Sequence, residues 1–251
     1  MTKFIFLTCV AAGLSASPAA AQSWDGPYVG AQIGYGSGKS DTEAELGGRW
    51  SVEIPTLVDH VTDFASANPD PKGLTYGLQA GYNFRAADAW VVGAEIDFAL
   101  LDVDGGRSDG PTPFPDIPAL IYSASNSVDA RHMLSLRAKA GYSFGSSLLY
   151  LHGGMAWVKA DYETALSSNG GYLKAGGRTK TSNGFIVGAG FEQMLGRSMS
   201  ARLEYSYTDQ GRVRTHNDYL PGSTFVSPAY TEDYRHDLKL HLVRAALNFH
   251  F

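Results

Sequence analysis

Much of the chain alternates between apolar and polar residues with a period of two. From residue 74 to residue 84, every second residue is apolar or aromatic, and those between are Thr, Gly, Gln or Asn. The same alternation recurs over 90–100, 134–144, 199–207 and 243–251, and more weakly over 27–37, 148–162 and 183–195. Because successive side chains of a β-strand point to opposite faces, the pattern predicts eight two-faced strands. The segment from 148 is the least regular, since Tyr150 and His152 have to lie on its polar face.

The lengths of the connections decide between a soluble sandwich and a membrane barrel. Three connections are short and turn-like, at 86–88, 145–147 and 196–198, and the other four are long, at 39–72, 103–130, 164–182 and 212–234. Short and long connections strictly alternate, so all the long ones lie at one end. A sandwich also alternates in polarity but has no reason to collect its long loops. The sequence therefore predicts an all-β fold: an eight-stranded, antiparallel, up-and-down transmembrane β-barrel with short periplasmic turns and four long external loops.

Aromatic residues gather at the two ends of the predicted strands. Those next to a short turn or the C-terminus are Tyr82, Phe84, Trp90, Tyr142, Phe144, Phe191, Phe249 and Phe251. Those toward the long loops are Tyr35, Tyr76, Phe98, Trp157, Phe185, Tyr205 and Tyr207. Two such bands are typical of the interfacial girdles of a membrane barrel, whereas core aromatics would not cluster at strand ends.

The N-terminal segment differs in composition from the rest of the chain. Lys3 is followed by an apolar run over 4–14 and by an Ala-rich end at Ala21. This order is typical of a cleavable secretory signal, rather than of a short buried helix. We expect a signal peptide over 1–21 and an outer-membrane barrel domain over 22–251. The single cysteine, Cys9, falls within the signal, and the remaining chain carries 25 acidic against 19 basic residues.

Composition excludes several other classes. A mean hydropathy of −0.16 excludes a protein of many membrane-spanning helices, and a 12% aromatic content with a net charge of −5 excludes a disordered chain. One cysteine excludes a disulfide scaffold.

The polar face of the strands predicts a packed interior, because the bore of eight strands is just wide enough to be filled by side chains. Many inward positions are Gly, and the charged ones balance: Glu95, Asp97, Glu192 and Glu204 against Arg137, Lys139, Arg202 and Arg244. Counted from the short-turn ends they fall in one layer, with acids and bases on neighbouring strands. Since buried charges persist only when paired, we expect a salt-bridge network that plugs the lumen. The alternative is an ion-selective constriction.

Several short motifs resemble a known family. Residues 24–36 (Trp-Asp-Gly-Pro-Tyr-Val-Gly-Ala-Gln-Ile-Gly-Tyr-Gly) resemble the first strand of the small porin-family barrels of alphaproteobacteria, also called outer-membrane immunogenic proteins. Residues 77–84, 93–97 and 202–205 resemble their second, third and seventh strands. The resemblance spans nearly the whole chain after the signal. It implies an eight-stranded barrel in the Gram-negative outer membrane that serves as a structural surface protein, with pore or ligand-binding roles in some members.

The barrel class also suggests partners. The chain ends on Phe251, behind which apolar residues alternate: Val243, Ala245, Leu247 and Phe249. In that class a terminal aromatic on an amphipathic last strand is an assembly signal read by the barrel-assembly machinery; the alternative is an ordinary closing strand. We expect outer-membrane lipid and lipopolysaccharide as further partners, with periplasmic or envelope partners open and no nucleic acid.

The first long connection, 39–72, carries seven acidic residues against three basic ones. Ile54, Leu57, Val58, Val61 and Phe64 fall at helical spacing within it. A short amphipathic helix that caps the barrel mouth or touches lipopolysaccharide would explain the spacing. The acidic composition favours a solvated loop with a small apolar cluster.

Candidate cofactor and enzyme sites are weak. The histidines show no metal spacing, and the acids show no calcium-loop spacing, so we expect no metal or cofactor. His132 and His152, on adjacent predicted strands, are the best candidates for a ligand such as haem. An outer-membrane lipid-modifying enzyme would use a set such as Asp233, His236 and Asp237, but no activated nucleophile accompanies them. The sequence predicts a non-enzymatic barrel that supports the envelope and presents external loops; a small porin or ligand-uptake protein is the alternative.

Overall fold

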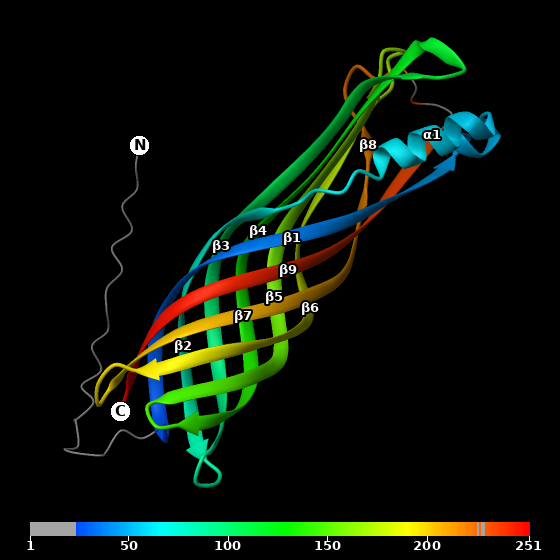
Figure 1. The fold of residues 1–251 in the computed structure, drawn as a ribbon. Coiled ribbons are helices and arrows are strands. Elements are labelled where there is room, and N and C mark those ends of the chain that lie inside the picture. The colour runs from blue at the N-terminus through cyan, green and yellow to red at the C-terminus, as the bar shows by residue number, and fades with distance from the viewer. Residues whose placement is uncertain (1–23, 225, 227–228) are drawn as a thin grey trace, which may run out of the picture.

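The computed structural model describes residues 24–224, 226 and 229–251, and in this part of the chain eight long antiparallel strands close into a barrel (Figure 1). The long strands are β1 (Gly26–Gly48), β2 (Lys72–Arg85), β3 (Trp90–Phe114), β4 (Ile117–Phe144), β5 (Ser147–Ser168), β6 (Leu173–Met194), β7 (Met199–His216) and β9 (Tyr230–His250). A two-residue strand, β8 (Asp218–Tyr219), pairs with β6. The predicted signal peptide lies outside the described residues.

Each long strand pairs with its neighbours in the chain, and β1 pairs with β9 to close the ring. The ring order is therefore β1-β2-β3-β4-β5-β6-β7-β9. Short turns join β2 to β3, β4 to β5 and β6 to β7, at the end where the C-terminus also lies (Figure 1). The predicted all-β, up-and-down barrel is confirmed.

We call the half of the barrel next to the short turns the lower half and the other the outer half. The outer surface of the lower half is apolar, as the alternation predicts. Leu78, Ile96 and Leu136 are at least half exposed on the outside, while Gln79, Asp97 and Arg137 beside them are buried inside. Tyr150 and His152 point inward with the polar set, so β5 keeps the phase of the barrel. The aromatic residues of both predicted girdles lie on the outer face, where they are exposed or half-buried.

The strands run much further than the alternation indicated. The segments expected to form long loops at 103–130, 164–182 and 212–234 are largely strand, and only two residues separate β3 from β4. Beyond the apolar band the outside of the barrel is polar and the inside becomes apolar: Leu101 and Val103 are buried while Asp102 and Asp104 are exposed. Because of this reversal, a pattern of apolar outer faces does not detect the outer parts of the strands.

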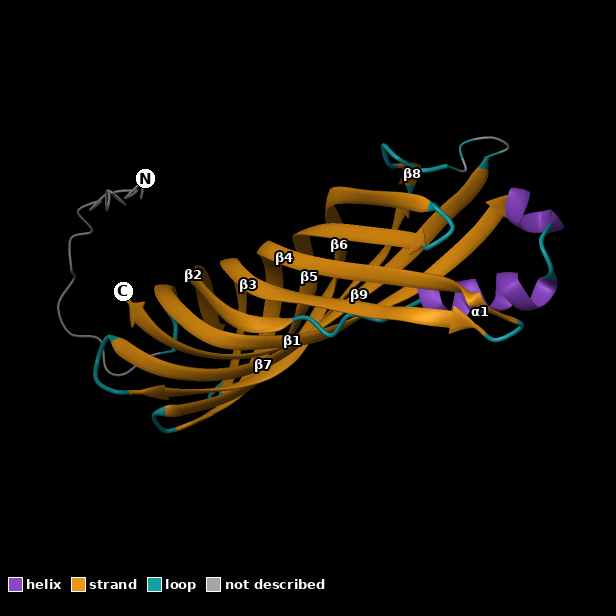
Figure 2. Ribbon diagram, turned by 90° about the horizontal axis from the view of Figure 1, so that it is seen from above, coloured by secondary structure: helices purple, strands orange, loops and turns teal. Residues whose placement is uncertain are grey.

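The mouth of the barrel is capped by a helix, so the solvated acidic loop favoured by composition is wrong. A short 3₁₀-helix (Arg49–Val52) leads to α1 (Pro55–Ala65), which lies across the external end (Figure 2). Leu57, Val61 and Ala65, four residues apart, form its buried face. Asn126 of β4 donates its amide to the carbonyl oxygens of Ala65 and Ala67, each at 2.8 Å, and satisfies the C-terminal end of the helix. Neither helix in the described part of the chain has the length and hydropathy needed to cross a membrane.

The connection from α1 to β2 covers an open sheet edge. β1 pairs with β2 only as far as Ser37, so the amides of its outer part need other acceptors. Gly38 donates to the Pro71 carbonyl at 2.8 Å, and Ser40 donates to that of Pro69 at 3.0 Å. Thr42 and Ala44 donate to the side chains of Asn68 and Ser66. The connection is thus part of the barrel wall.

Replacing Val61 by Asp should detach α1 without opening the barrel. Val61 is fully buried, and an unpaired carboxylate at this position costs several kcal/mol. Trypsin cleavage at Arg49 or Lys72, which flank the helix, should become at least tenfold faster while the far-ultraviolet circular dichroism of the barrel is unchanged. Asp63→Asn, at an exposed position of the same helix, is the matched control and should leave cleavage slow. Equal protection of both variants would contradict the packing of α1.

Candidate functional site: the charged lumen

All eight charged residues predicted for the lumen are buried and lie in one network. Direct cross-strand neighbours supply three of the contacts: Glu95 with Arg137, Glu192 with Arg202, and Glu204 with Arg244. The Arg202 Nη2–Glu192 Oε2 distance is 3.2 Å and the Arg244 Nη2–Glu204 Oε1 distance is 2.7 Å. Antiparallel pairing therefore places acid beside base around the wall.

Further contacts cross the bore. Arg202 on β7 donates to Glu95 on β3 at 2.6 Å, and these two strands stand opposite each other in the ring. Arg137 on β4 donates to Glu204 on β7 at 2.6 Å. Arg244 on β9 reaches Asp97 on β3 at 3.2 Å. Side chains from facing strands therefore meet across the bore in this layer.

Neutral polar side chains complete the network, and they were not predicted from the sequence. Tyr28 donates to Glu95, Gln32 to Asp97, and Tyr150 to Glu204 at 2.7 Å. Two inward glycines make room for these rings: a Cβ on Gly81 would lie 2.4 Å from the Tyr28 hydroxyl, and one on Gly190 would lie 2.2 Å from that of Tyr150. The alternation could have identified the two tyrosines, because it places both of them on the inner face of their strands.

Lys139 has the weakest partners of the eight. Its Nζ lies 3.8 Å from Glu192, too far for a good hydrogen bond, and 4.4 Å from the centre of the Tyr28 ring. The Tyr150 ring stands on its other side at 5.2 Å. Two aromatic faces therefore replace a second carboxylate around this ammonium group.

Buried apolar clusters lie on both sides of the charges. Toward the short turns, Trp24, Val91, Leu148 and Met194 pack with Tyr150. Above the charges, a larger buried cluster fills the outer half of the barrel. It comprises Ala99, Leu101, Val103, Val128, Ala130, Met133, Ala156, Val158, Ala160, Tyr162, Ile186, Val213, Leu238, Leu240 and Leu242. The apolar layers were not expected from the sequence, which indicated a polar interior.

The histidine pair suggested for haem does not converge. His132 keeps the phase of Leu134 and lies on the outer face beside Phe98. His152 points into the lumen, with Nε2 3.7 Å from Glu204. The two rings lie on opposite sides of the wall, so the proposed pair cannot bind one ligand.

The three residues suggested for an enzyme site also lie apart. His236 is buried between the hydroxyls of Thr42 and Thr215, at 3.2 and 3.0 Å. Asp233 faces outward and pairs with His216 at 2.9 Å, and Asp237 lies 3.5 Å from Arg212. The arrangement does not bring the two carboxylates to His236.

His236 should make the outer half of the barrel sensitive to acid. It lies beyond the apolar band, and burial lowers its pKa to about 4, below the ordinary value of 6.5. The unfolded state then binds the proton first, so stability is complete above pH 6.5 and falls as the pH drops toward 4, by about 3 kcal/mol.

The measurement compares the wild type with His236→Gln. Burial raises the pKa of the nearby Glu232, which acts in the opposite sense, so only the difference between the two proteins isolates the histidine. Hydrogen exchange of β9 amides should accelerate at pH 4.5 in the wild type relative to the variant. Parallel pH profiles would refute the role of His236.

A second polar cluster lies just below the mouth. Glu232 is fully buried and accepts hydrogen bonds from Tyr172 and from Asn217 at 3.0 Å. Above it, a cavity of about 270 Å³ opens among Trp50, Glu53, Leu57, Tyr122, Tyr172 and Tyr230. We call this cavity the mouth pocket.

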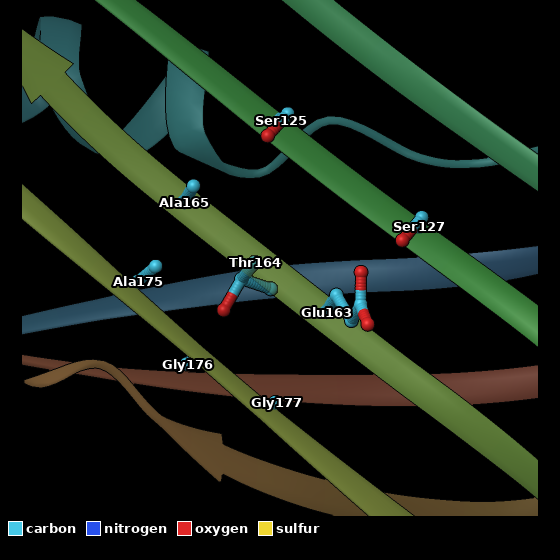
Figure 3. A pocket seen from close by; sticks show the side chains of 8 residues that line it. All are labelled: Ser125, Ser127, Glu163, Thr164, Ala165, Ala175, Gly176 and Gly177. Carbon is cyan, nitrogen blue, oxygen red and sulfur yellow. The ribbon is translucent and has the colours of Figure 1, made fainter.

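Another hollow, of about 350 Å³, lies on the outer wall (Figure 3). Ser125 and Ser127 of β4 and Glu163 of β5 line it, beside Gly176 and Gly177 of β6, which carry no side chains to fill it. Thr164 of β5, next to Glu163, turns inward and contacts Asn217. This hollow therefore belongs to the external surface and does not enter the lumen.

Comparisons with known proteins agree with this architecture. The family model described as "Outer membrane protein beta-barrel domain" matches residues 6–234. The 31 kDa outer-membrane immunogenic protein of Brucella melitensis is 28% identical over 94% of this chain and 88% of its own length. The 25 kDa outer-membrane immunogenic protein of the same species is 27% identical over 85% of this chain and 76% of its own.

Among solved structures, the outer membrane protease OmpT from Escherichia coli aligns over 93% of this chain and 99% of its own, with a TM-score of 0.51 and 8% identity. That likeness concerns the fold alone. The family match covers most of the sequence, and the lipid-facing surface fits it. The chain thus belongs to the outer-membrane protein β-barrel domain family, and its place is the outer membrane of Gram-negative bacteria.

Proposed function

We propose that this protein is a closed, non-enzymatic barrel that strengthens the outer membrane and presents a rigid external surface. The ion pair between Arg202 and Glu95 on opposite strands carries the proposal, because it divides the bore. The apolar layers above and below add two further seals. In a barrel filled in this way, the interior side chains stabilise the fold and leave no channel for solutes.

Conductance in a planar bilayer tests the closed lumen. The purified, refolded protein should give no steady current under conditions in which a large porin conducts. Leu240 and its neighbours seal the bore independently of the charges, so Arg202→Met should also remain closed. Large, steady currents from the wild type would overturn the closed barrel in favour of a small porin.

Lipid and lipopolysaccharide are the proposed surroundings of the outer face. Above the upper aromatic girdle, outward charges pair along the wall: Arg131 contacts Asp129 at 3.2 Å, and Lys239 contacts Asp41 at 3.1 Å. Such a belt offers both cations for lipid phosphates and carboxylates for bridging divalent ions. Exposed pairs of this kind contribute little to folding, so their arrangement supports a role at the surface.

Loss of the gene tests the structural role. A deletion strain should become more sensitive to detergents and bulky apolar antibiotics, and the wild-type gene should restore resistance. Purified protein incubated with lipopolysaccharide should release no fatty acid. Unchanged sensitivity would remove the envelope role, and deacylation would replace it with an enzymatic one.

A further inference from the structure

We propose that the mouth pocket binds a compact alkylated ammonium group, such as the trimethylammonium of choline. This inference is independent of whether the lumen conducts, because the pocket lies at the external end, above the apolar layer that fills the outer barrel. Its volume of about 270 Å³ is just below the usual range for small-molecule sites, about 300–1,000 Å³. A headgroup fits such a space, whereas a large planar ligand does not.

The aromatic rings of the pocket form a corner of a box. Trp50 meets Tyr230 with ring centroids 5.0 Å apart at 76°, and meets Tyr172 at 5.7 Å and 72°. Tyr172 and Tyr230 meet at 5.7 Å and 82°. The three rings stand nearly perpendicular to one another, and all three line the pocket. A compact cation is attracted to aromatic rings, since each ring face carries partial negative charge.

Carboxylates add a matching charge. Glu53 lines the pocket and accepts a hydrogen bond from the Tyr230 hydroxyl at 2.6 Å. Glu232 lies beneath it, hydrogen-bonded to Tyr172. Burial, together with Tyr230 and these two carboxylates, raises the pKa of Tyr122 to about 12, so this residue remains a neutral phenol. Arg49, 3.8 Å from Glu53, offsets part of that charge from outside.

The same cluster already accommodates one ammonium group. Lys174 Nζ lies 4.6 Å above the centre of the Tyr219 ring and donates to the Tyr230 carbonyl at 2.7 Å. Tyr219 in turn packs edge-on against Tyr172, a wall of the pocket. The aromatic assembly therefore already contacts one ammonium group, which is not among the residues that line the cavity, although burial lowers the pKa of Lys174.

A saccharide is the competing ligand for a pocket rich in Trp and Tyr. Sugars need a flat aromatic platform and many hydrogen-bonding groups. Here the rings meet edge to face, and the hydroxyls of Tyr172 and Tyr230 are engaged by Glu232 and Glu53. The pocket therefore offers aromatic faces and a carboxylate, which is the combination that recognises an alkylated ammonium.

Titration of the refolded full-length protein with choline tests the proposal, with 3,3-dimethylbutan-1-ol as the neutral probe of the same shape. The protein is held in a polyoxyethylene detergent, which carries neither ammonium nor sugar, at constant ionic strength. Calorimetry should show choline binding on the order of tenfold more tightly than the neutral probe. Equal binding of both probes, tighter binding of a hexose, or no saturation by choline would each overturn the inference.

Two variants locate the site. Glu53→Gln should weaken choline binding roughly threefold to tenfold while binding of the neutral probe is unchanged. Glu163→Gln, in the outer-wall hollow, is the matched control and should bind choline like the wild type. Loss of binding in both variants, or in neither, would place the site elsewhere. Free choline compared with phosphatidylcholine vesicles added to the external face distinguishes a soluble ligand from a lipid headgroup.

Discussion

Arg202→Met should lower the free energy of unfolding by about 3 kcal/mol, because it leaves buried carboxylates without their principal cation. Arg202 contacts Glu95 at 2.6 Å and Glu192 at 3.2 Å, and its side chain is 2% exposed. Reversible urea unfolding in lipid vesicles, followed by tryptophan fluorescence, measures the loss. The barrel should still form, since neither the strand pairing nor the outer apolar surface changes.

Charge balance supplies the control for this experiment. Arg202→Met combined with Glu192→Gln returns the network to equal numbers of acids and bases, so more than half of the lost stability should return. Arg197→Met, at an exposed position in the turn between β6 and β7, should change stability by less than about 0.5 kcal/mol. A loss below about 1 kcal/mol for Arg202→Met would mean that the network fills space without stabilising the fold.

The lower half of the barrel was predictable because one rule governs every strand there. Lipid requires apolar side chains outside, and a narrow bore requires paired polar ones inside. The charges of Glu95 and Arg137 therefore indicate that both residues face the lumen and that they pair with each other. Their contacts across the bore were less accessible to prediction, because they depend on where β7 stands relative to β3 and β4.

The outer half follows a second rule that reverses the first. Once the wall leaves the membrane, water favours polar residues outside, and the apolar ones turn inward. Where the rules meet, two apolar neighbours stand together, one on each face: Leu242 is fully buried and Val243 is half exposed. Leu100 and Leu101 of β3 form a similar pair, with 41% and 6% exposure. On β3 and β9, these doublets mark the point at which the apolar side chains change from the outside of the barrel to the inside.

Helix α1 was misjudged for a different reason. Its acidic neighbours indicated solvation, but burial is decided by one face, and Leu57, Val61 and Ala65 share that face. The partners that bury it lie on several strands, such as Ala44 on β1, Phe114 on β3 and Tyr122 on β4. Local composition cannot show contacts between segments so far apart in the chain. The outward position of His132 was predictable, by contrast, because His132 keeps the alternation of Leu134 and Leu136.

Deletion of Phe251 should reduce the amount of assembled barrel several-fold in cells while scarcely changing the stability of the refolded protein. The side chain is 51% exposed and packs mainly on Phe249, with ring centroids 5.1 Å apart. Its backbone amide donates to the Pro27 carbonyl at 3.1 Å, a single hydrogen bond at the end of the barrel. Losing these contacts costs about 1 kcal/mol, too little to unfold the protein.

A large loss in cells would therefore reflect recognition of the terminal aromatic by the assembly machinery rather than folding energy. Heat-modifiable migration of outer-membrane fractions on gels measures the assembled amount, and urea unfolding of refolded protein measures stability. Phe191→Ala is the matched control, because Phe191 lies in the same lower aromatic band and is 41% exposed, but stands within β6. If both variants reduced assembly equally, the lower aromatic band as a whole would matter, and Phe251 would be an ordinary member of the closing strand.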